Sequence, residues 1–330
     1  MNTRIEGFKG FMFIGDPHLA SYRPGRRQDD YQNVILDKLR QAAVIATTDK
    51  LVPIILGDLF HKPKENDLSL IYNLSDVCEQ FPIQPVTLEG NHDKSETRLT
   101  DKDTLKLVSK FGIVRVITAT DLVGEYDFEG SIVRLYAVPY GAEIPKDLPE
   151  ADGVTNIIIT HHDLNFSGTP ENFQPLREIT NCKMLVNGHI HKKLPSFSCG
   201  GMRAHNPGNI ARLSIDVKDE VPSVWEWAPA YNNFELKRHI LRYTAAVFDL
   251  TGENVQAESG AKSVKALEKS LFAELVAGQT KMEGSRSDDA SGLKRDMDEI
   301  FEELQVSEPV RLLLGKLRRE AVKALKAVDN

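Results

Sequence analysis

Short runs of apolar and β-branched residues recur along the first part of the chain, and amphipathic stretches lie between them. Most positions in these runs are apolar, which is typical of strands buried on both faces. The stretches 30–47 and 67–81 repeat apolar residues at three- and four-residue spacing, which predicts helices. This alternation predicts an α/β layered fold. The apolar runs cover residues 11–15, 52–56, 85–88, 114–117, 132–138, 156–160 and 183–188.

The pattern becomes shorter and more strictly alternating after about residue 195. The segments 212–217 and 223–228 predict antiparallel strands that continue the sheets. Trp225 and Trp227 share one face of the second segment, which favours a place in a core or an interface.

The last part of the chain is predicted to be helical. Residues 263–278 have helical periodicity and precede a linker-like segment, 279–292. A mostly acidic helix, 293–305, and a mostly basic helix, 310–328, follow. The last helix carries one apolar stripe. Two interpretations stay open: the stripe binds a partner protein, or the two helices pack on each other as a hairpin.

Composition and charge restrict the class of protein. The 330 residues include 41% hydrophobic and 27% charged residues, as in soluble proteins, and contain no apolar run long enough to cross a membrane. The N-terminus lacks the pattern of an export signal, and the three cysteines have no C-x-x-C spacing. These features predict a cytoplasmic protein without disulfides. The net charge of −7 means that any site for a polyanion must be local.

Side chains that can bind a metal ion follow five of the predicted strands. Such residues converge in one crevice when they follow the carboxyl ends of strands in an open α/β sheet. Any one of them alone is more often a turn former, but five in this order are hard to produce by accident. Carboxylate, amide and imidazole together suit Mn²⁺, Fe or Zn²⁺. The groups are Asp16 and His18 in GDPH, Asp58 in GDLFH, Asn91, His92 and Asp93 in GNHD, His161 and His162 in HH, and His189 and His191 in GHIH.

The ordered set D-x-H, G-D, G-N-H-D, H and G-H-x-H resembles the calcineurin-like metallophosphoesterase superfamily over about residues 10–230. The resemblance implies a four-layer α-β-β-α sandwich with a C-terminal helical appendage. It also implies two divalent metal ions, with Mn²⁺ expected and Fe or Zn²⁺ as alternatives. The implied domains are a phosphoesterase domain, a reduced capping or linking segment, and a linker with a helical pair. Their boundaries are 1–235, 236–278 and 279–330.

The resemblance assigns a role to each of these residues. His92 contacts the phosphate and assists departure of the leaving oxygen, and Asp93 orients His92. His161 is preferred to His162 as a ligand because it comes first after its strand. The ligands of one metal are Asp16, His18, Asp58 and His191, and those of the other are Asn91, His161 and His189, with Asp58 bridging.

The segment GDLFH further resembles SbcD-type DNA-repair nucleases, in which the histidine of this motif, here His61, places the phosphodiester at the metals. RPGRRQDD (23–30) and NPGNIAR (206–212) have counterparts in that branch, although Asn209 stands where serine is usual. Basic residues near the ligand loops are either a DNA-binding rim or ordinary solvated side chains. They are Arg23, Arg26, Arg27, Lys62, Lys64, Lys94, Arg98, Lys192, Lys193 and Arg203.

Three functions are compatible with these motifs. The first is an SbcD-like exonuclease or endonuclease in DNA repair, recombination or end processing, in which a metal-bound hydroxide attacks the phosphodiester. It acts on DNA by structure or ends, and its expected protein partners are an SbcC-type coiled-coil ATPase at the C-terminal helices and a second copy of this chain. The alternative is a nucleotide phosphodiesterase or phosphatase on the same scaffold. A metal-poor binding scaffold is disfavoured because every ligand position is filled.

Overall fold

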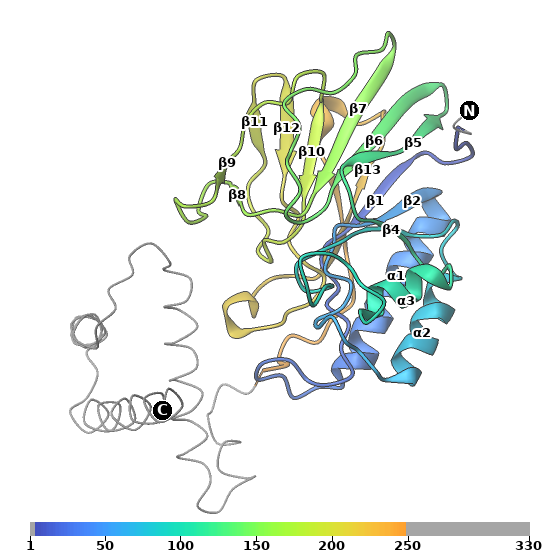
Figure 1. Ribbon diagram of the computed structural model, residues 1–330, viewed down its shortest axis with the longest axis vertical. Helices are drawn as coiled ribbons and strands as arrows, with labels where there is room; N and C mark the ends of the chain where they lie inside the picture. The colour runs from blue at the N-terminus through green and yellow to red at the C-terminus, as the bar shows by residue number, and fades with distance from the viewer. Residues whose placement is uncertain (1–3, 249–330) are drawn as a thin grey trace, which may run out of the picture. The chain divides into compact units, whose positions relative to one another are not determined.

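The structure is a computed structural model, and it describes residues 4–248. Twelve strands form two large sheets (Figure 1). The strands of the first sheet are β1 (Gly10–Ile14), β2 (Leu51–Ile55), β3 (Val86–Leu88), β4 (Arg115–Ile117), β13 (Ser223–Trp227) and β14 (Lys237–Ile240). Those of the second are β5 (Asp121–Phe128), β6 (Ser131–Val138), β7 (Val154–Thr160), β10 (Met184–Asn187), β11 (Phe197–Cys199) and β12 (Met202–His205).

Both sheets are mixed. The first has the order β14-β13-β1-β2-β3-β4, and its strands from β1 to β4 are parallel. The second has the order β11-β12-β10-β7-β6-β5, with β12, β10, β7 and β6 parallel. The predicted α/β class is therefore confirmed. The remaining elements are α1 (Tyr31–Asp49), α2 (Leu68–Cys78), α3 (Thr104–Lys110), the short strands β8 (Leu164–Asn165) and β9 (Gln174–Pro175), and the 3₁₀ turns η1 (Ile215–Val217) and η2 (Asn232–Phe234).

The two long predicted helices, α1 and α2, begin at aspartate caps. The side chain of Asp30 accepts a hydrogen bond from the Asn33 amide, and that of Asp67 accepts one from the Leu70 amide. These carboxylates satisfy amides that the first helical turn leaves without a partner. Lys50 ends α1 in a left-handed conformation, and the chain then enters β2 directly.

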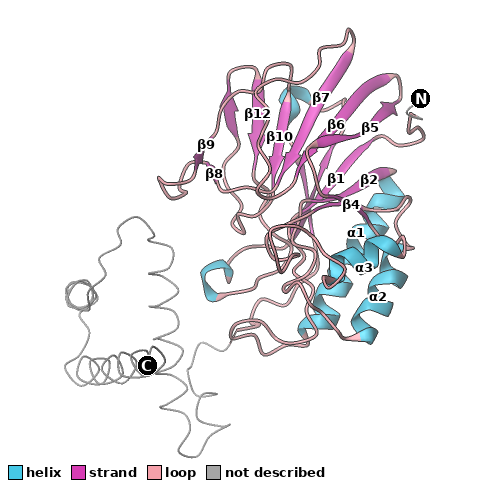
Figure 2. Ribbon diagram, viewed as in Figure 1, coloured by secondary structure: helices cyan, strands magenta, loops and turns pink. Residues whose placement is uncertain are grey.

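The alternation of side chains along β1 divides the core into layers. Met12 and Ile14 pack with the helices, whereas Phe11 and Phe13 pack between the two sheets, because successive residues of a strand point to opposite faces. Figure 2 shows α1, α2 and α3 together on one side of the first sheet. Trp225 is buried in the layer between the sheets, as is Trp227, which stacks on Phe234.

The four-layer sandwich implied that helices cover the outer face of the second sheet, and the structure covers this face with other elements. Ile158 and Leu185 of this sheet pack with Leu164, Phe166 and Ile179, which lie in connecting segments. In the described part of the chain no helix lies between β5 and β12. Loops and the β8–β9 pair therefore form the outer layer.

Two further expectations differ from the structure. Residues 212–217 are not a strand: the Arg212 side chain is buried and donates to the carbonyls of Lys218 and Ala245, and η1 follows. Residue 236 does not begin a separate unit, because β14 pairs with β13 immediately afterwards. The predictions for residues 249–330, which include the helical pair and its partner, lie outside the described residues.

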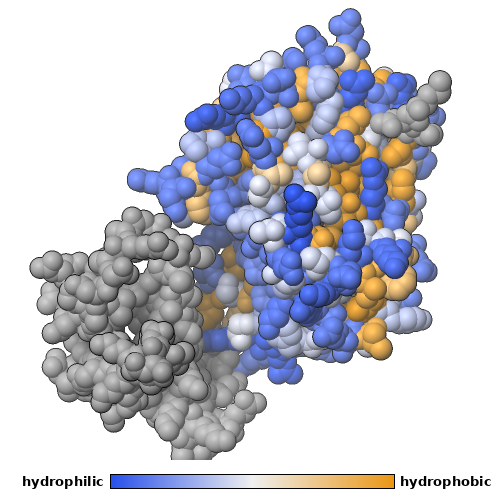
Figure 3. Space-filling model, viewed as in Figure 1, coloured by the Kyte–Doolittle hydropathy of each residue, from blue (hydrophilic) through white to orange (hydrophobic). Residues whose placement is uncertain are grey.

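On the side shown in Figure 3, the surface of residues 4–248 is mostly hydrophilic, with smaller apolar areas. None of the helices in this part is long and apolar enough to cross a membrane.

Candidate metal centre

The candidate ligands follow the carboxyl ends of parallel strands. Asp16 and His18 follow β1, Asp58 follows β2, and Asn91 follows β3. His161 follows β7 in the second sheet, and the loop after β10 holds the last two, His189 and His191. Parallel strands direct these loops to one edge of each sheet, as expected for α/β folds.

One group of ligand atoms comes from Asp16, His18, Asp58 and His191, and these atoms lie within 4.8 Å of one another. The Nε2 atoms of His18 and His191 are 2.9 Å apart, and His18 Nε2 is 3.7 Å from Asp58 Oδ2. The structure thus brings together the four residues that the sequence assigned to one metal.

A second group consists of Asp58, His161 and His189, again with ligand atoms within 4.8 Å. His161 Nε2 is 3.3 Å from Asp58 Oδ2 and 3.2 Å from Asn91 Oδ1. The same Asn91 oxygen is 2.9 Å from His189 Nδ1. Asp58 belongs to both groups, which is the position of a bridging ligand.

The donor atoms fit divalent cations. Asp16 and Asp58 are each 1% exposed, yet Asp16 Oδ1 and Asp58 Oδ2 are buried without a hydrogen-bond partner in the described structure. A buried carboxylate oxygen without a partner is costly, and a cation would remove that cost. The mixture of carboxylate, amide and imidazole donors suits Mn²⁺, Fe or Zn²⁺.

Burial and neighbouring charges set the protonation of these groups. Burial lowers the pKa of His18 and lowers that of His191 to about 4, so both imidazoles are neutral at neutral pH, as metal ligands must be. Burial likewise raises the pKa of Asp16 to about 6. Burial disfavours the charged forms of Asp58 and His161, but the attraction between the two opposite charges is stronger than this effect. The pKa of Asp58 is therefore lowered, and that of His161 is raised to about 9.

The backbone is strained at the candidate ligands. Asp16, His18, Asp58 and His189 have φ values of 21°, 47°, 45° and 71°, which non-glycine residues rarely adopt. Such conformations cluster at functional sites, where the surrounding structure holds them. The backbone also passes very close to a ligand at Gly90, where a Cβ atom would overlap Asp58 Oδ1.

His92 and His61 lie beside the first ligand group. The His92 ring centroid is 4.9 Å from that of His18, and the rings of His61 and His92 stack with centroids 5.5 Å apart. His92 Nδ1 is 2.9 Å from the His61 carbonyl oxygen, and the His92 amide donates to Asp58 Oδ1 at 2.8 Å. Burial lowers the pKa of His61 to about 4.

The prediction that Asp93 orients His92 does not match the structure. The Asp93 carboxylate accepts hydrogen bonds from the amides of Leu59, Phe60 and Gly90. It therefore ties the GDLFH loop to the GNHD loop, and the carbonyl of His61 occupies the position that would orient the His92 ring. Fully buried, Asp93 is better placed to satisfy backbone amides than to reach the site.

Two residues near the site, Asp163 and Tyr140, are not part of any motif that the sequence shows. Asp163 Oδ1 is 2.9 Å from His189 Nε2, and its position directly after HH could have indicated this. The Tyr140 ring lies 5.4 Å from that of His189. His162, not chosen as a ligand, has its Nε2 2.8 Å from the Ala142 carbonyl and so points to the outer layer.

The proposed basic rim divides into exposed and structural residues. Arg27 is 4% exposed, pairs with Asp29 and donates to the Arg212 carbonyl. The Lys94 ammonium is 2.6 Å from Glu89 and also donates to the Tyr140 carbonyl. These two side chains are used inside the fold and do not form a free rim. The exposed residues of the predicted set are Arg23, Arg26, Lys62, Lys64, Arg98, Lys192 and Lys193.

Arg203 also lies away from the candidate site. It is in register with Met184 at the start of β10, whereas the candidate ligands follow the end of that strand. Its guanidinium pairs with Glu235 at 2.6 Å. Sequence proximity to the GHIH motif was misleading here because the chain reverses between the two.

The match to a family model agrees with this geometry. Residues 10–193 match the family model of the calcineurin-like phosphoesterases. A solved structure described as a 5'-nucleotidase precursor from Thermus thermophilus is similar, with 14% identity and a TM-score of 0.38. The similarity covers 80% of this chain and 59% of that one. A search of curated proteins found no match. The family match covers more than half of the chain, so the chain belongs to the calcineurin-like phosphoesterases.

Proposed function

We propose that this phosphoesterase is an SbcD-like nuclease that hydrolyses DNA phosphodiester bonds. The observation that carries the proposal is the position of His61. Its ring stacks on His92 and lies 5.4 Å from His18, so a second imidazole borders the candidate metal centre. Hydrolysis of a small phosphoester requires the metal ligands and His92, but it does not require this additional histidine.

In this proposal Asp58 would act as a ligand of two divalent cations, because it belongs to both groups of candidate ligands. Two bound cations supply positive charge that stabilises the attacking and leaving oxygens of a phosphoryl displacement. Mn²⁺ is the expected metal, and the donor set also suits Fe and Zn²⁺. Asp16, His18 and His191 would complete one site, and Asn91, His161 and His189 the other.

His92 is the side chain placed to give a proton to the leaving oxygen. If its Nδ1–H donates to the His61 carbonyl, the ring orientation is fixed, and the imidazolium form would carry on Nε2 the proton that passes to the leaving oxygen. The His92 amide is held by Asp58, so the ring stays next to the ligands of both groups. His61 would orient the phosphate from the neighbouring position.

Charge on the loops supports a polyanionic substrate. Lys62 and Lys64 follow His61, while Lys192 and Lys193 follow His191, and all four are exposed. Such side chains neutralise backbone phosphates without reading bases. DNA would therefore be recognised by its structure or its ends.

The test is a cleavage assay with Mn²⁺ on single-stranded, duplex and hairpin DNA beside a panel of nucleotides. We expect DNA cleavage by the wild type, none by Asp58→Ala, and a loss of about 10²- to 10⁴-fold in His92→Asn with DNA binding retained. Hydrolysis of nucleotides without any hydrolysis of DNA, across several metals, would instead identify a nucleotide phosphodiesterase or phosphatase.

The role of His61 is tested separately. His61→Asn should lower the rate on DNA by about 10²-fold and leave the hydrolysis of a small aryl phosphodiester nearly unchanged. His239→Asn, on β14, is the matched control and should retain both rates. An equal loss on both substrates would contradict a role of His61 in placing DNA.

A further inference from the structure

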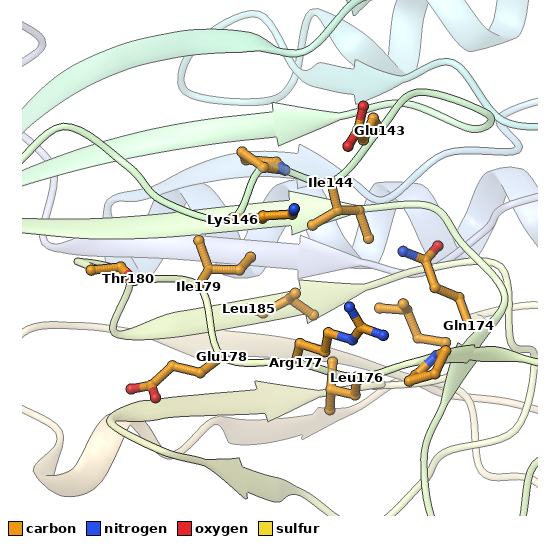
Figure 4. A pocket seen from close by; sticks show the side chains of 13 residues that line it. Glu143, Ile144, Lys146, Gln174, Leu176, Arg177, Glu178, Ile179, Thr180 and Leu185 are labelled. Carbon is orange, nitrogen blue, oxygen red and sulfur yellow. The ribbon is translucent and has the colours of Figure 1, made fainter.

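A cavity of about 510 Å³ lies in the outer layer of the second sheet, apart from the candidate metal ligands. Its walls come from residues 143–146 and 174–180, and Leu164 and Leu185 complete the lining (Figure 4). The volume is within the range of pockets that hold small organic ligands. None of the residues assigned to the metals lines it.

Backbone hydrogen bonds hold the wall formed by residues 174–180 at both of its ends. At one end Thr180 donates its amide to the Lys146 carbonyl, and Leu148 donates to the Thr180 carbonyl, both at 2.9 Å. At the other end β8 pairs with β9, and the Gln174 amide donates to the Asp163 carbonyl at 2.8 Å. A preformed pocket loses little conformational entropy when a ligand binds.

The lining is largely apolar. Ile144, Leu164, Leu176, Ile179 and Leu185 all belong to or pack against the buried cluster on the outer face of the sheet. Ile179, Leu185 and Leu164 are at most 3% exposed and form the packed floor of the cavity, whereas Ile144 and Leu176 are only partly buried and present accessible apolar surface. An apolar body that lies on this surface gains free energy from its removal from water.

Two cations accompany this apolar lining, one from each wall. In Figure 4 the ammonium end of Lys146 is turned toward Ile144. The guanidinium end of Arg177 lies between Leu185 and Gln174. Neither cation forms an ion pair within residues 4–248. An acidic group between the two walls would pair with them.

The acidic residues of the lining do not neutralise these cations. The Glu178 carboxylate points away from the other labelled side chains in Figure 4 and accepts a hydrogen bond from the Gly201 amide. Glu143 lies at the end of the cavity near β6 and forms no ion pair with Lys146 or Arg177. The charge that faces the apolar lining is therefore mainly positive.

We propose that this cavity binds a small organic anion that has an apolar body and one acidic group. The body would lie on Ile144 and Leu176, above the floor that Ile179 and Leu185 form, and the acidic group would lie between Lys146 and Arg177. A medium-chain carboxylic acid has this chemistry. The inference does not depend on DNA being the substrate of the metal centre.

The experiment measures binding of the fluorescent anion anilinonaphthalene sulfonate to the full-length protein. The test variants are the double charge reversal Lys146→Glu/Arg177→Glu and the occluding substitution Leu176→Trp. The matched control is Lys102→Glu/Lys106→Glu, because these lysines are exposed on or beside α3 and away from the cavity. Thermal unfolding of each variant verifies that it is folded, and the charge reversals change only exposed residues.

We expect saturable binding to the wild type and the control, and at least about tenfold weaker binding to both test variants. Displacement of the probe by decanoate would identify a medium-chain carboxylic acid as a ligand of the cavity. The proposal is overturned if the wild type does not bind the probe, or if the charge-reversed protein binds it as tightly as the control does. Unchanged binding by folded Leu176→Trp would likewise exclude this cavity.

Discussion

Replacing Lys38 by methionine should stabilise the protein at neutral pH. Lys38 lies on α1 and is 1% exposed, although lysine is strongly hydrated in water. Burial lowers its pKa to about 7, and the nearby guanidinium groups of Arg27 and Arg212 contribute to this shift, against the opposing effect of Asp29 and Asp37. Methionine has a similar length and no charge.

The magnitude follows from the pKa. A change from 10.5 to about 7 corresponds to about 5 kcal/mol of cost for the charged amine in the folded state. Since replacement of a buried charge by an apolar side chain of similar volume gains about 1–4 kcal/mol, we expect Lys38→Met to gain within that range at neutral pH.

The pH dependence gives the stricter test. Between pH 7 and pH 10.5 the unfolded state binds more protons than the folded state, so the stability of the wild type rises with pH across this window. Lys38→Met has no amine at this position, so its free energy of unfolding does not rise in this way. The difference in free energy of unfolding between Lys38→Met and the wild type should therefore shrink, as the pH rises, by up to about 1.4 kcal/mol per pH unit. Urea unfolding from about pH 6 to about pH 10, followed by tryptophan fluorescence, measures both proteins.

Lys102→Met, at an exposed position, is the control and should show no such trend. If the wild type and Lys38→Met have parallel stability curves over the whole range, the amine is not held in the environment that the structure gives it, and the reasoning is refuted.

Three further predictions concern the metal centre and the core. Chelation with EDTA should lower the melting temperature, and Mn²⁺ at about 100 times its Kd should restore about 3 kcal/mol of the free energy of unfolding. In calorimetry, Asp58→Ala should show neither effect. Gly90→Ala should reduce metal affinity, measured by isothermal titration, because its Cβ would displace the Asp58 carboxylate; wild-type affinity would contradict the close approach. Leu135→Ala, fully buried between the sheets, should cost about 2–5 kcal/mol in urea unfolding; a cost like that of Leu68→Ala, which is 80% exposed, would contradict the layer assignment.

Much of the fold could be predicted from local patterns. The strands β1, β2 and β7 are fully or mostly buried, and their apolar runs are visible in the sequence. The helices α1 and α2 carry both an apolar periodicity and an aspartate cap. The outer layer of the second sheet could not be found in this way, because irregular loops bury side chains without any period.

The candidate site was visible because its groups occur in order after successive strands. The same reasoning failed for Asp93, Arg27 and Lys94, whose partners are distant in sequence or are backbone groups. A charged residue beside a motif can face the site or be consumed inside the fold. Only the position of its partner decides between these outcomes.

The sequence by itself determined the α/β class, the order of the ligand motifs and the types of donor atom, because strand periodicity and residue chemistry are local properties. The tertiary structure alone placed Asp58 within reach of both ligand groups and set His61 against His92. It also opened a cavity between two loops of the outer layer. These features depend on how segments far apart in the chain approach one another, and distances in space are not encoded in any single stretch of residues.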